Sequence, residues 1–325
     1  MMTIQLPTGF TARPATMDDL QTVVDVMNAV TQADVGKSDT TLFTVRRYWE
    51  SDDLNLETDT LLICAPDGQA AGCAQFIAET PPMPYDVDTW VHPAYFGTSV
   101  GDALLQWIDQ RAQQALLTAP AGVPASIGHI YVYAQNRSAQ QRLEKSGYTR
   151  ERIFYRMEIV FDAPPPEPQL PPGISIRSFR RGEEDQAVYE AFEEAQADEW
   201  GHERLPFDKW RYYFIDVEEN FDPEAWFLAW EGETIVGYAL CRWERAGEPD
   251  RSTVRYLAVR KPWRKRGIAL ALLHAAFGGM YQQGKRGAGL GVDATSYTGA
   301  DRLYVRAGMN RAFETLRYRK VIREK

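Results

Sequence analysis

The sequence predicts an α/β fold in which one unit, a central mixed β-sheet flanked by helices, occurs twice in tandem. A chain of 325 residues exceeds the length of a typical single domain. Segments of the same kind also recur in the same order, about 160 residues apart. In each copy, two strands around a tight turn come first and strand–helix–strand patterns follow. This order favours a mixed sheet with helices on both faces.

Each copy begins with a short strand and a helix. The stretch "PTGFTARPATMDDLQTVVDVM" starts at Pro7, and "PPGISIRSFRRGEEDQAVYEAF" starts at Pro171. Both contain a glycine, a strand pattern that ends near Arg13 or Arg177, an acidic helix start and apolar residues at helical spacing. The first elements of the two copies therefore correspond.

The middle of each copy combines a strand pair with a helix. The runs "TLLICAPDGQAAGCAQFIAE" and "AWFLAWEGETIVGYALCRWE" each predict two apolar strands around a turn, at Asp67-Gly68 and Glu231-Gly232. A strand end, a glycine-containing loop and a helix follow in "WVHPAYFGTSVGDALLQWIDQ" and "AVRKPWRKRGIALALLHAAFG". Each copy then has a strand, a polar loop and a short helix that ends at Gly147 or Gly308.

A proline-rich segment separates the copies. Residues 163–173, "APPPEPQLPPG", contain six prolines. Because proline lacks the backbone N–H and fixes φ, this segment predicts an extended linker and neither helix nor central strand. We therefore expect domains at 1–162 and 174–325 with the linker at 163–173.

Composition limits the class of protein. With 44% hydrophobic and 25% charged residues and a net charge of −9, the chain resembles an ordinary globular protein. Apolar runs stay shorter than a membrane span, and the first residues lack the pattern of a secretion signal. The three cysteines and four histidines show no metal-site spacing, so we expect reduced thiols, no metal and a cytoplasmic location.

One segment reverses the acidic balance. Between Arg251 and Arg286 there are nine basic residues and no acidic residue. Within it, Arg264–Ala269 follows the predicted strand Val254–Val259 and precedes a helix. Unpaired N–H groups and the helix dipole favour an anion at such a helix start. The pattern suits a diphosphate better than a single carboxylate, although many surface basic runs are only solvated.

The motif Arg264-x-x-Gly267-x-Ala269 resembles the acyl-CoA signature of the GNAT superfamily of N-acetyltransferases. The similarity extends upstream through "LAV" and downstream through "TGADRLYVRAGM". The tandem arrangement resembles mycothiol synthase-like members of that superfamily. The resemblance implies that acetyl-CoA lies between two diverging central strands. The implied cofactor contacts are Leu257, Ala258, Val259, Arg264, Lys265, Arg266, Gly267, Ile268, Ala269, Ser296, Gly299, Ala300 and Leu303.

The resemblance also suggests catalytic residues. Tyr304 matches the tyrosine near the thioester sulfur, and a phenol there can act as general acid toward the departing thiolate; the alternative is a half-buried tyrosine. Mycothiol synthase-like proteins can place a glutamate early on the strand before the loop, where this chain has Thr253. The acidic segment 193–207 offers Glu199 as a candidate base, with Trp200 and His202 as candidate acceptor contacts. Alternatively this segment is an acidic, solvated helix end with a buried Trp200.

The first copy departs from the motif. Phe96, Ser99 and Leu143 stand where the second copy has Arg264, Gly267 and Tyr304. Residues 85–119 carry four acidic residues and one basic residue, which disfavours a diphosphate. We therefore expect the first copy to be degenerate and the chemistry to lie in the second.

These expectations combine into a function. We expect an acetyl-CoA-dependent N-acetyltransferase that acetylates a primary amine of a small molecule, as a monomer or homodimer, without nucleic-acid or membrane partners. A non-catalytic acyl-CoA-binding or regulatory protein is the alternative. Nucleic-acid binding through the basic segment ranks last, because the chain is acidic and lacks an aromatic stacking series.

Overall fold

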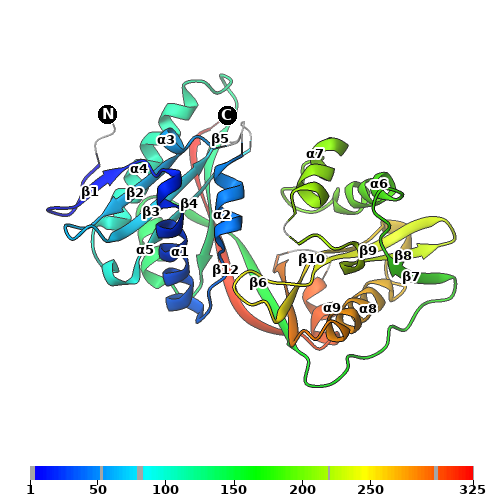
Figure 1. Ribbon diagram of the computed structural model, residues 1–325. Helices are drawn as coiled ribbons and strands as arrows, with labels where there is room; N and C mark the ends of the chain where they lie inside the picture. Colours follow the sequence, from blue (N-terminus) through cyan, green and yellow to red (C-terminus); the bar gives the residue numbers. More distant parts are fainter. Residues whose placement is uncertain (1–3, 52–53, 79–82, 219, 296–298, 325) are drawn as a thin grey trace. The chain divides into compact units, whose positions relative to one another are not determined.

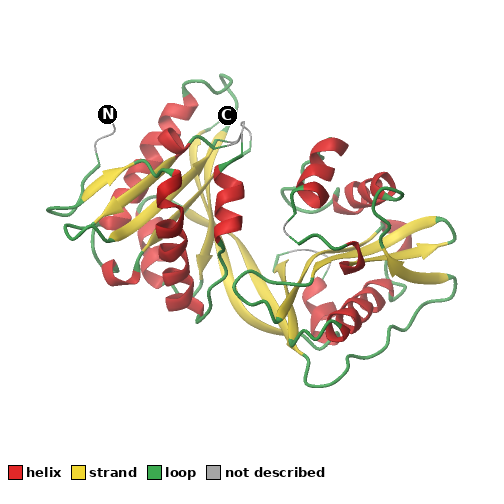
Figure 2. Cartoon of the chain, viewed as in Figure 1, coloured by secondary structure: helices red, strands yellow, loops and turns green. Residues whose placement is uncertain are grey.

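A computed structural model describes residues 4–51, 54–78, 83–218, 220–295 and 299–324. The chain forms two compact units. Unit 1 comprises Met1–Phe154 and Phe313–Lys325, and unit 2 comprises Tyr155–Ala312. In each unit, helices cover both faces of a β-sheet (Figures 1 and 2). The predicted fold class is therefore confirmed.

Unit 1 has a sheet in the order β1-β2-β3-β4-β5-β12-β6. Strand β4 runs parallel to β5 and antiparallel to β3, so the sheet is mixed. Its strands are β1 (Thr11–Arg13), β2 (Thr60–Cys64), β3 (Ala70–Ile77), β4 (Tyr85–Val91), β5 (Ala125–Tyr133) and β6 (Thr149–Val160), together with β12 (Asn310–Arg323). Its α-helices are α1 (Leu20–Val35), α2 (Leu42–Trp49), α3 (Leu56–Asp59), α4 (Val100–Leu116) and α5 (Arg137–Lys145).

Alternating side chains of the unit 1 sheet supply two separate cores. Leu62 and Cys73 pack with α1 and α2 residues such as Trp49. The next residues along the strands, Ile63 and Ala74, belong instead to the core that α4 covers. Because successive strand residues point to opposite faces, the apolar runs predicted as strands fill both layers.

Unit 2 repeats this plan with its sheet in the order β6-β11-β10-β9-β8-β7. Its strands are β7 (Ile174–Ser178), β8 (Trp226–Glu231), β9 (Thr234–Arg242), β10 (Arg251–Val259) and β11 (Gly287–Asp293). Its α-helices are α6 (Asp185–Gln196), α7 (Phe207–Arg211), α8 (Ile268–Gln282) and α9 (Ala300–Arg306), and a π-helical turn, Tyr212–Asp216, follows α7.

Large aromatic side chains fill the α6/α7 side of unit 2. Trp210 is fully buried and stacks on Phe214 with ring centroids 5.0 Å apart. Phe192 stacks on Tyr238 of β9 at 5.8 Å. Figure 1 shows α6 and α7 on one side of β8–β10, and α8 and α9 on the other. Aromatic pairs of this kind fix the helices against the sheet beyond the effect of burial alone.

Strands β6 and β12 each continue from one unit into the other. The sequence-based boundaries place 313–325 in the second copy, whereas Thr315–Arg323 pairs antiparallel with β5 in unit 1. Correspondingly, the end of β6 lies beside β11 in unit 2, where Phe161 N–H donates to Arg286 O at 2.9 Å. Hydrophobic periodicity predicts these strands, but it does not predict which strands they pair with.

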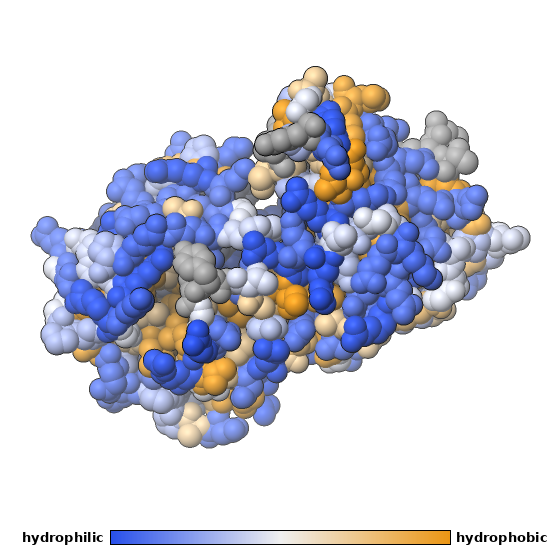
Figure 3. Space-filling view, turned by 180° about the vertical axis from the view of Figure 1, so that it is seen from behind, coloured by the Kyte–Doolittle hydropathy of each residue, from blue (hydrophilic) through white to orange (hydrophobic). Residues whose placement is uncertain are grey.

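The surface agrees with a globular protein. Hydrophilic residues predominate on the face in Figure 3, with apolar residues in small groups. Within the described ranges, no helix is both long and apolar enough to cross a bilayer. All three cysteines are free, and burial raises the pKa of the Cys73 and Cys241 thiols, which makes both poor nucleophiles.

Candidate functional site

The candidate site of unit 2 begins where β10 and β11 separate. Their parallel pairing ends at Thr253–Gly289, although β10 continues to Val259 and β11 to Asp293. Among the described residues, the edge of β10 that faces β11 therefore has no strand partner beyond Thr253. Unpaired backbone N–H and C=O groups are strong hydrogen-bonding groups. The predicted cofactor contacts Leu257–Val259 lie on this open edge.

A β-bulge interrupts β10 at the start of the open edge. The register with β9 shifts between Val254 and Tyr256, so Arg255 is an extra residue of β10 that has no residue of β9 opposite it. Bulges bend a strand and redirect its side chains, and they are common next to active sites. This bulge bends β10 where it leaves β11.

The helix that follows β10 presents an anion site. Gly267 lies at its N-cap with φ of +88°, and no side chain caps the first turn of α8. Free N–H groups and the dipole favour a negative group there. A Cβ at Gly267 would meet no protein atom within 4 Å, so the positive φ, not crowding, requires glycine. Lys265 also has a positive φ, of 64°, in the same loop.

Acidic side chains of α6 and the loop after it hold much of the basic loop. Asp198 lies 2.8 Å from Lys261 and 3.7 Å from Arg264, and Glu194 binds Arg260. Glu231 similarly binds Arg266 at 2.8 Å. Lys265 is exposed and has no ion pair among the residues that the structure describes. These free N–H groups and cations fit a diphosphate, which must exchange with the internal carboxylates.

Tyr304 and Glu199 lie close enough to influence each other. Burial, and then the Glu199 carboxylate, raise the pKa of the Tyr304 phenol above its usual value. Surrounding protein atoms raise the pKa of the Glu199 carboxyl, although the residue as a whole is exposed. Arg264 partly opposes that rise, whereas Asp293 and Asp198 add to it. The structure therefore brings the two predicted catalytic residues and the basic loop together.

Comparison with known proteins identifies the family. The model of the acetyltransferase (GNAT) family matches the chain twice, over residues 25–148 and 186–309. The chain belongs to the GNAT family of acetyltransferases. The predicted resemblance and the duplication are thereby confirmed, and GNAT enzymes take their acetyl group from acetyl-CoA.

Individual relatives are similar over most of the chain. A mycothiol acetyltransferase of Salinispora arenicola is 30% identical over 268 residues, which cover 77% of this chain and 78% of that protein. A GCN5-related N-acetyltransferase of Sphaerobacter thermophilus is 37% identical, with a TM-score of 0.83 over 98% of both chains. A tandem GNAT protein from the clavulanic acid biosynthesis pathway shares the fold, with a TM-score of 0.71 and 12% identity over 97% of this chain and 99% of that chain.

The remaining predicted site residues are the cofactor contacts near α9 and the acceptor contact Trp200. Gly299 caps α9 with φ of 64°, and Ala300 and Leu303 lie in that helix next to Tyr304. Ser296 lies outside the described residues. Trp200 lies in the loop after α6 and is exposed, so the alternative of a buried Trp200 is wrong. The predicted cofactor contacts among these residues thus lie at α9, and the predicted acceptor contact Trp200 lies in the acidic loop after α6.

Sequence reasoning missed the partner of His202. The His202 Nε2 atom lies 2.9 Å from Glu193 Oε2, and the Glu193 side chain is only 3% exposed. The other Glu193 oxygen is buried and has no hydrogen-bond partner within the part of the chain that the structure describes. The His202 backbone N–H donates to Glu199 O at 3.2 Å, so the pair is joined to the candidate base. The sequence spacing of Glu193 and His202 does not predict the turn that brings the two side chains together.

Unit 1 has the same strand separation but a different cleft. The parallel pairing of β4 and β5 ends at Val87–His129. The β3–β4 register is unbroken from Gly72–Val91 to Ile77–Asp86, so this cleft lacks the bulge of unit 2. His129 lies where unit 2 has Gly289, and its Nε2 is 2.9 Å from Thr89 Oγ1.

Side chains of unit 1 also close the start of α4. A Cβ at Gly101 would lie 2.3 Å from the guanidinium carbon of Arg142, so that side chain fills the space beside the first turn. Arg142 is 14% exposed and lies 3.7 Å from Asp102. Leu143, at the position of Tyr304, is buried. Burial also lowers the pKa of His129 to about 3, so it adds no positive charge at neutral pH.

Proposed function

We propose that this protein is an acetyl-CoA-dependent N-acetyltransferase that transfers the acetyl group to a primary amine of a small molecule, with the chemistry in unit 2. The contrast between the two clefts carries the proposal. Among the described residues, both clefts have separated strands and an uncapped helix start, but the bulge and a tyrosine at the position of Tyr304 occur in unit 2 and not in unit 1. In unit 1, Arg142, His129 and Leu143 fill the corresponding positions.

The proposed binding mode follows from the free polar groups of unit 2. The N–H groups of α8, with Lys265, Arg264 and Arg266, hold the pyrophosphate of acetyl-CoA. The open edge at Leu257–Val259 receives the amides of the pantetheine arm. This arrangement directs the thioester toward Thr253, where the two strands meet.

The proposed reaction is direct transfer. The amine nitrogen attacks the acetyl carbonyl carbon, a C–N bond forms, and the C–S bond breaks as CoA thiolate leaves. The amine gives up one proton and the thiolate takes up one. Tyr304 stays protonated at neutral pH because its pKa is raised. Its pKa lies above that of a thiol, ~8.5, so it stabilises the thiolate mainly by donating a hydrogen bond.

Glu199 is the proposed proton acceptor. Its raised pKa makes it a better base than an ordinary surface glutamate. His202, fixed by Glu193, and Trp200 border the same loop and face the incoming amine in this proposal. Because similar proteins are named mycothiol acetyltransferase, the acceptor of those enzymes is the first amine to assay.

Calorimetric titration of acetyl-CoA into the full chain tests the proposal. We expect one site per chain, and we expect Gly267→Glu to abolish it, because a carboxylate at a positive-φ position strains the loop and repels the diphosphate. Ser99→Glu, at the corresponding position of unit 1, is the matched control and should leave binding unchanged. Release of CoA thiol on addition of an amine then separates an enzyme from an acyl-CoA-binding protein.

Two results would contradict the proposal. Two sites per chain, with one lost in Ser99→Glu, would show that unit 1 binds the cofactor. One site without thiol release for any amine would favour the regulatory alternative.

A further inference from the structure

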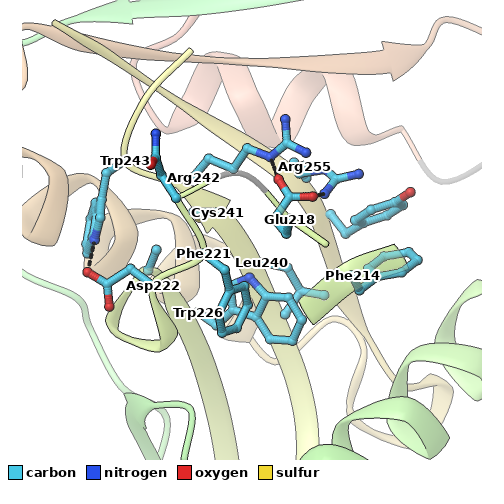
Figure 4. Close-up of a pocket in the computed structure, with 13 residues that line it drawn as sticks. Phe214, Glu218, Phe221, Asp222, Trp226, Leu240, Cys241, Arg242, Trp243 and Arg255 are labelled. Carbon is cyan, nitrogen blue, oxygen red and sulfur yellow. Dashed lines mark hydrogen bonds and ion pairs between the residues drawn. The ribbon is translucent and has the colours of Figure 1, made fainter. Parts of the chain in front are cut away.

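The bulge in β10 creates a pocket next to the proposed reaction centre. Consecutive strand residues normally point to opposite faces. At the bulge, however, Arg255 and Tyr256 both line one pocket on the side of the sheet that faces the π-helical turn. Figure 4 shows Arg255 beside Phe214, with Glu218 between it and Arg242. In unit 1, the described register of β4 with β3 has no such bulge.

Arg255 is held rigidly in this pocket. Its Nη1 donates to Glu218 at 2.8 Å, and Glu218 also forms an ion pair with Arg242. The Arg255 guanidinium lies 5.6 Å from the ring centroid of Phe214 and 5.7 Å from that of Tyr256. A guanidinium fixed by a carboxylate and two rings has little side-chain entropy left to lose on binding.

The charge arrangement of the pocket favours an anion. Glu218 is buried, with 3% of its side chain exposed, whereas Arg242 and Arg255 are 38% and 28% exposed. The carboxylate therefore lies beneath the two partly exposed cations. The second acid, Asp222, accepts from the Trp243 indole N–H at 2.7 Å and from the Glu224 backbone N–H at 2.9 Å. Both of its oxygens are thus engaged away from the arginines (Figure 4).

The size of the pocket limits its occupant. About 330 Å³ of space lies among the lining residues, and part of it is open solvent, so the enclosed room is much smaller. Trp226, Phe221 and Leu240 form its apolar floor. It suits one small planar group attached to a larger molecule better than a complete ligand.

We propose that this pocket is a specificity subsite that binds a carboxylate on the amine acceptor through Arg255. This inference rests on the proposed function, which puts the acetyl group at the adjacent strand separation. The amine lies at Thr253 and the carboxylate end lies in the pocket. A guanidinium fork matches the two oxygens of a carboxylate, which makes Arg255 a specificity determinant.

Matched acceptors test the subsite. Acetyl transfer is measured with ω-amino acids of increasing chain length and with their carboxamides, which differ only in the charge of one end. We expect at least one acid to have a KM about ten- to hundredfold below that of its amide, the effect of one or two charge-assisted hydrogen bonds. Arg255→Gln should remove that preference and leave the KM of acetyl-CoA unchanged. Glucosamine and its 6-phosphate form a further pair, which shows whether a phosphate is accepted instead.

Controls separate the subsite from general effects. Arg180→Gln removes an exposed arginine of unit 2, 62% exposed and paired with Glu183, and should change nothing. Arg255→Gln leaves Glu218 less well neutralised, so Arg255→Gln/Glu218→Gln provides a second, charge-balanced variant that must also lose the preference. The same pairs are titrated into protein saturated with CoA, where no turnover occurs.

Several outcomes would overturn the inference. Equal KM and equal binding of acid and amide throughout the series would do so, as would a preference that survives in both arginine variants. A preference for the phosphate alone would replace carboxylate with phosphate as the ligand. Failure of acetyl-CoA to bind at all is a different result, because it overturns the proposed function itself.

Discussion

At the scale of single residues, Tyr304 and Glu199 have separable roles that a pH profile distinguishes. A base must be deprotonated to act, so activity should fall as the pH drops through the raised pKa of Glu199. We expect Glu199→Gln to remove this acidic limb and Tyr304→Phe to keep it. Tyr304→Phe should instead lower kcat about 10- to 100-fold by removing the donor to the sulfur.

The controls for this pair of variants are kinetic. Both should keep most of the affinity for acetyl-CoA, because neither side chain is proposed to hold its pyrophosphate. An unchanged kcat in Tyr304→Phe would show that the buried phenol is structural. A persistent acidic limb in Glu199→Gln would direct attention to the Glu193–His202 pair, where His202→Asn would be the next variant.

At the scale of elements, the sequence predicts what depends on local pattern. The strands, the turns at Gly68 and Gly232, and the helix ends before Gly147 and Gly308 follow from periodicity and glycine, and all four glycines have positive φ. The bulge at Arg255 has no such signature, because it depends on how β9 and β10 align. The sequence therefore did not predict the pocket beside the bulge, and it did not predict the contact of Glu193 with His202.

The basic loop shows a further limit of pattern. Its sequence lacks acidic residues, yet α6 and the following loop bring Glu194 and Asp198 onto it. We expect Asp198→Asn to bind CoA about two- to fivefold more tightly, because Lys261 and Arg264 then need not exchange a carboxylate for the diphosphate. Calorimetry at low and at high salt measures the change, which should shrink as salt screens the charges.

The matched control for this element is Glu183→Gln. Glu183 forms an exposed ion pair with Arg180. The Glu183→Gln substitution therefore removes one negative charge, as Asp198→Asn does, without changing a contact of the basic loop. Equal tightening in both variants would mean that only net charge matters. Weaker binding in Asp198→Asn would mean that Asp198 positions the arginine instead of competing with the ligand.

At the scale of the whole molecule, the two copies are not separable at the proline-rich linker. Leu316 and Tyr318 of β12 are 3% and 1% exposed and belong to the core of unit 1. Arg317 of the same strand pairs with Asp86 at 2.5 Å and with Glu151 at 3.3 Å. The end of the chain thus completes the sheet of the first copy, which hydrophobic pattern alone does not reveal.

We therefore expect residues 1–162 alone to lack cooperative thermal unfolding. Losing the burial of Leu316 and Tyr318 alone costs about 3–6 kcal/mol, a large part of the ~5–15 kcal/mol that stabilises a domain. Residues 310–325, joined to 1–162 through a Gly/Ser linker, should restore a cooperative transition measured by circular dichroism. The same fusion with Leu316→Asp is the control and should fail. Equal melting of 1–162 with and without the added strand would show that unit 1 is complete without β12.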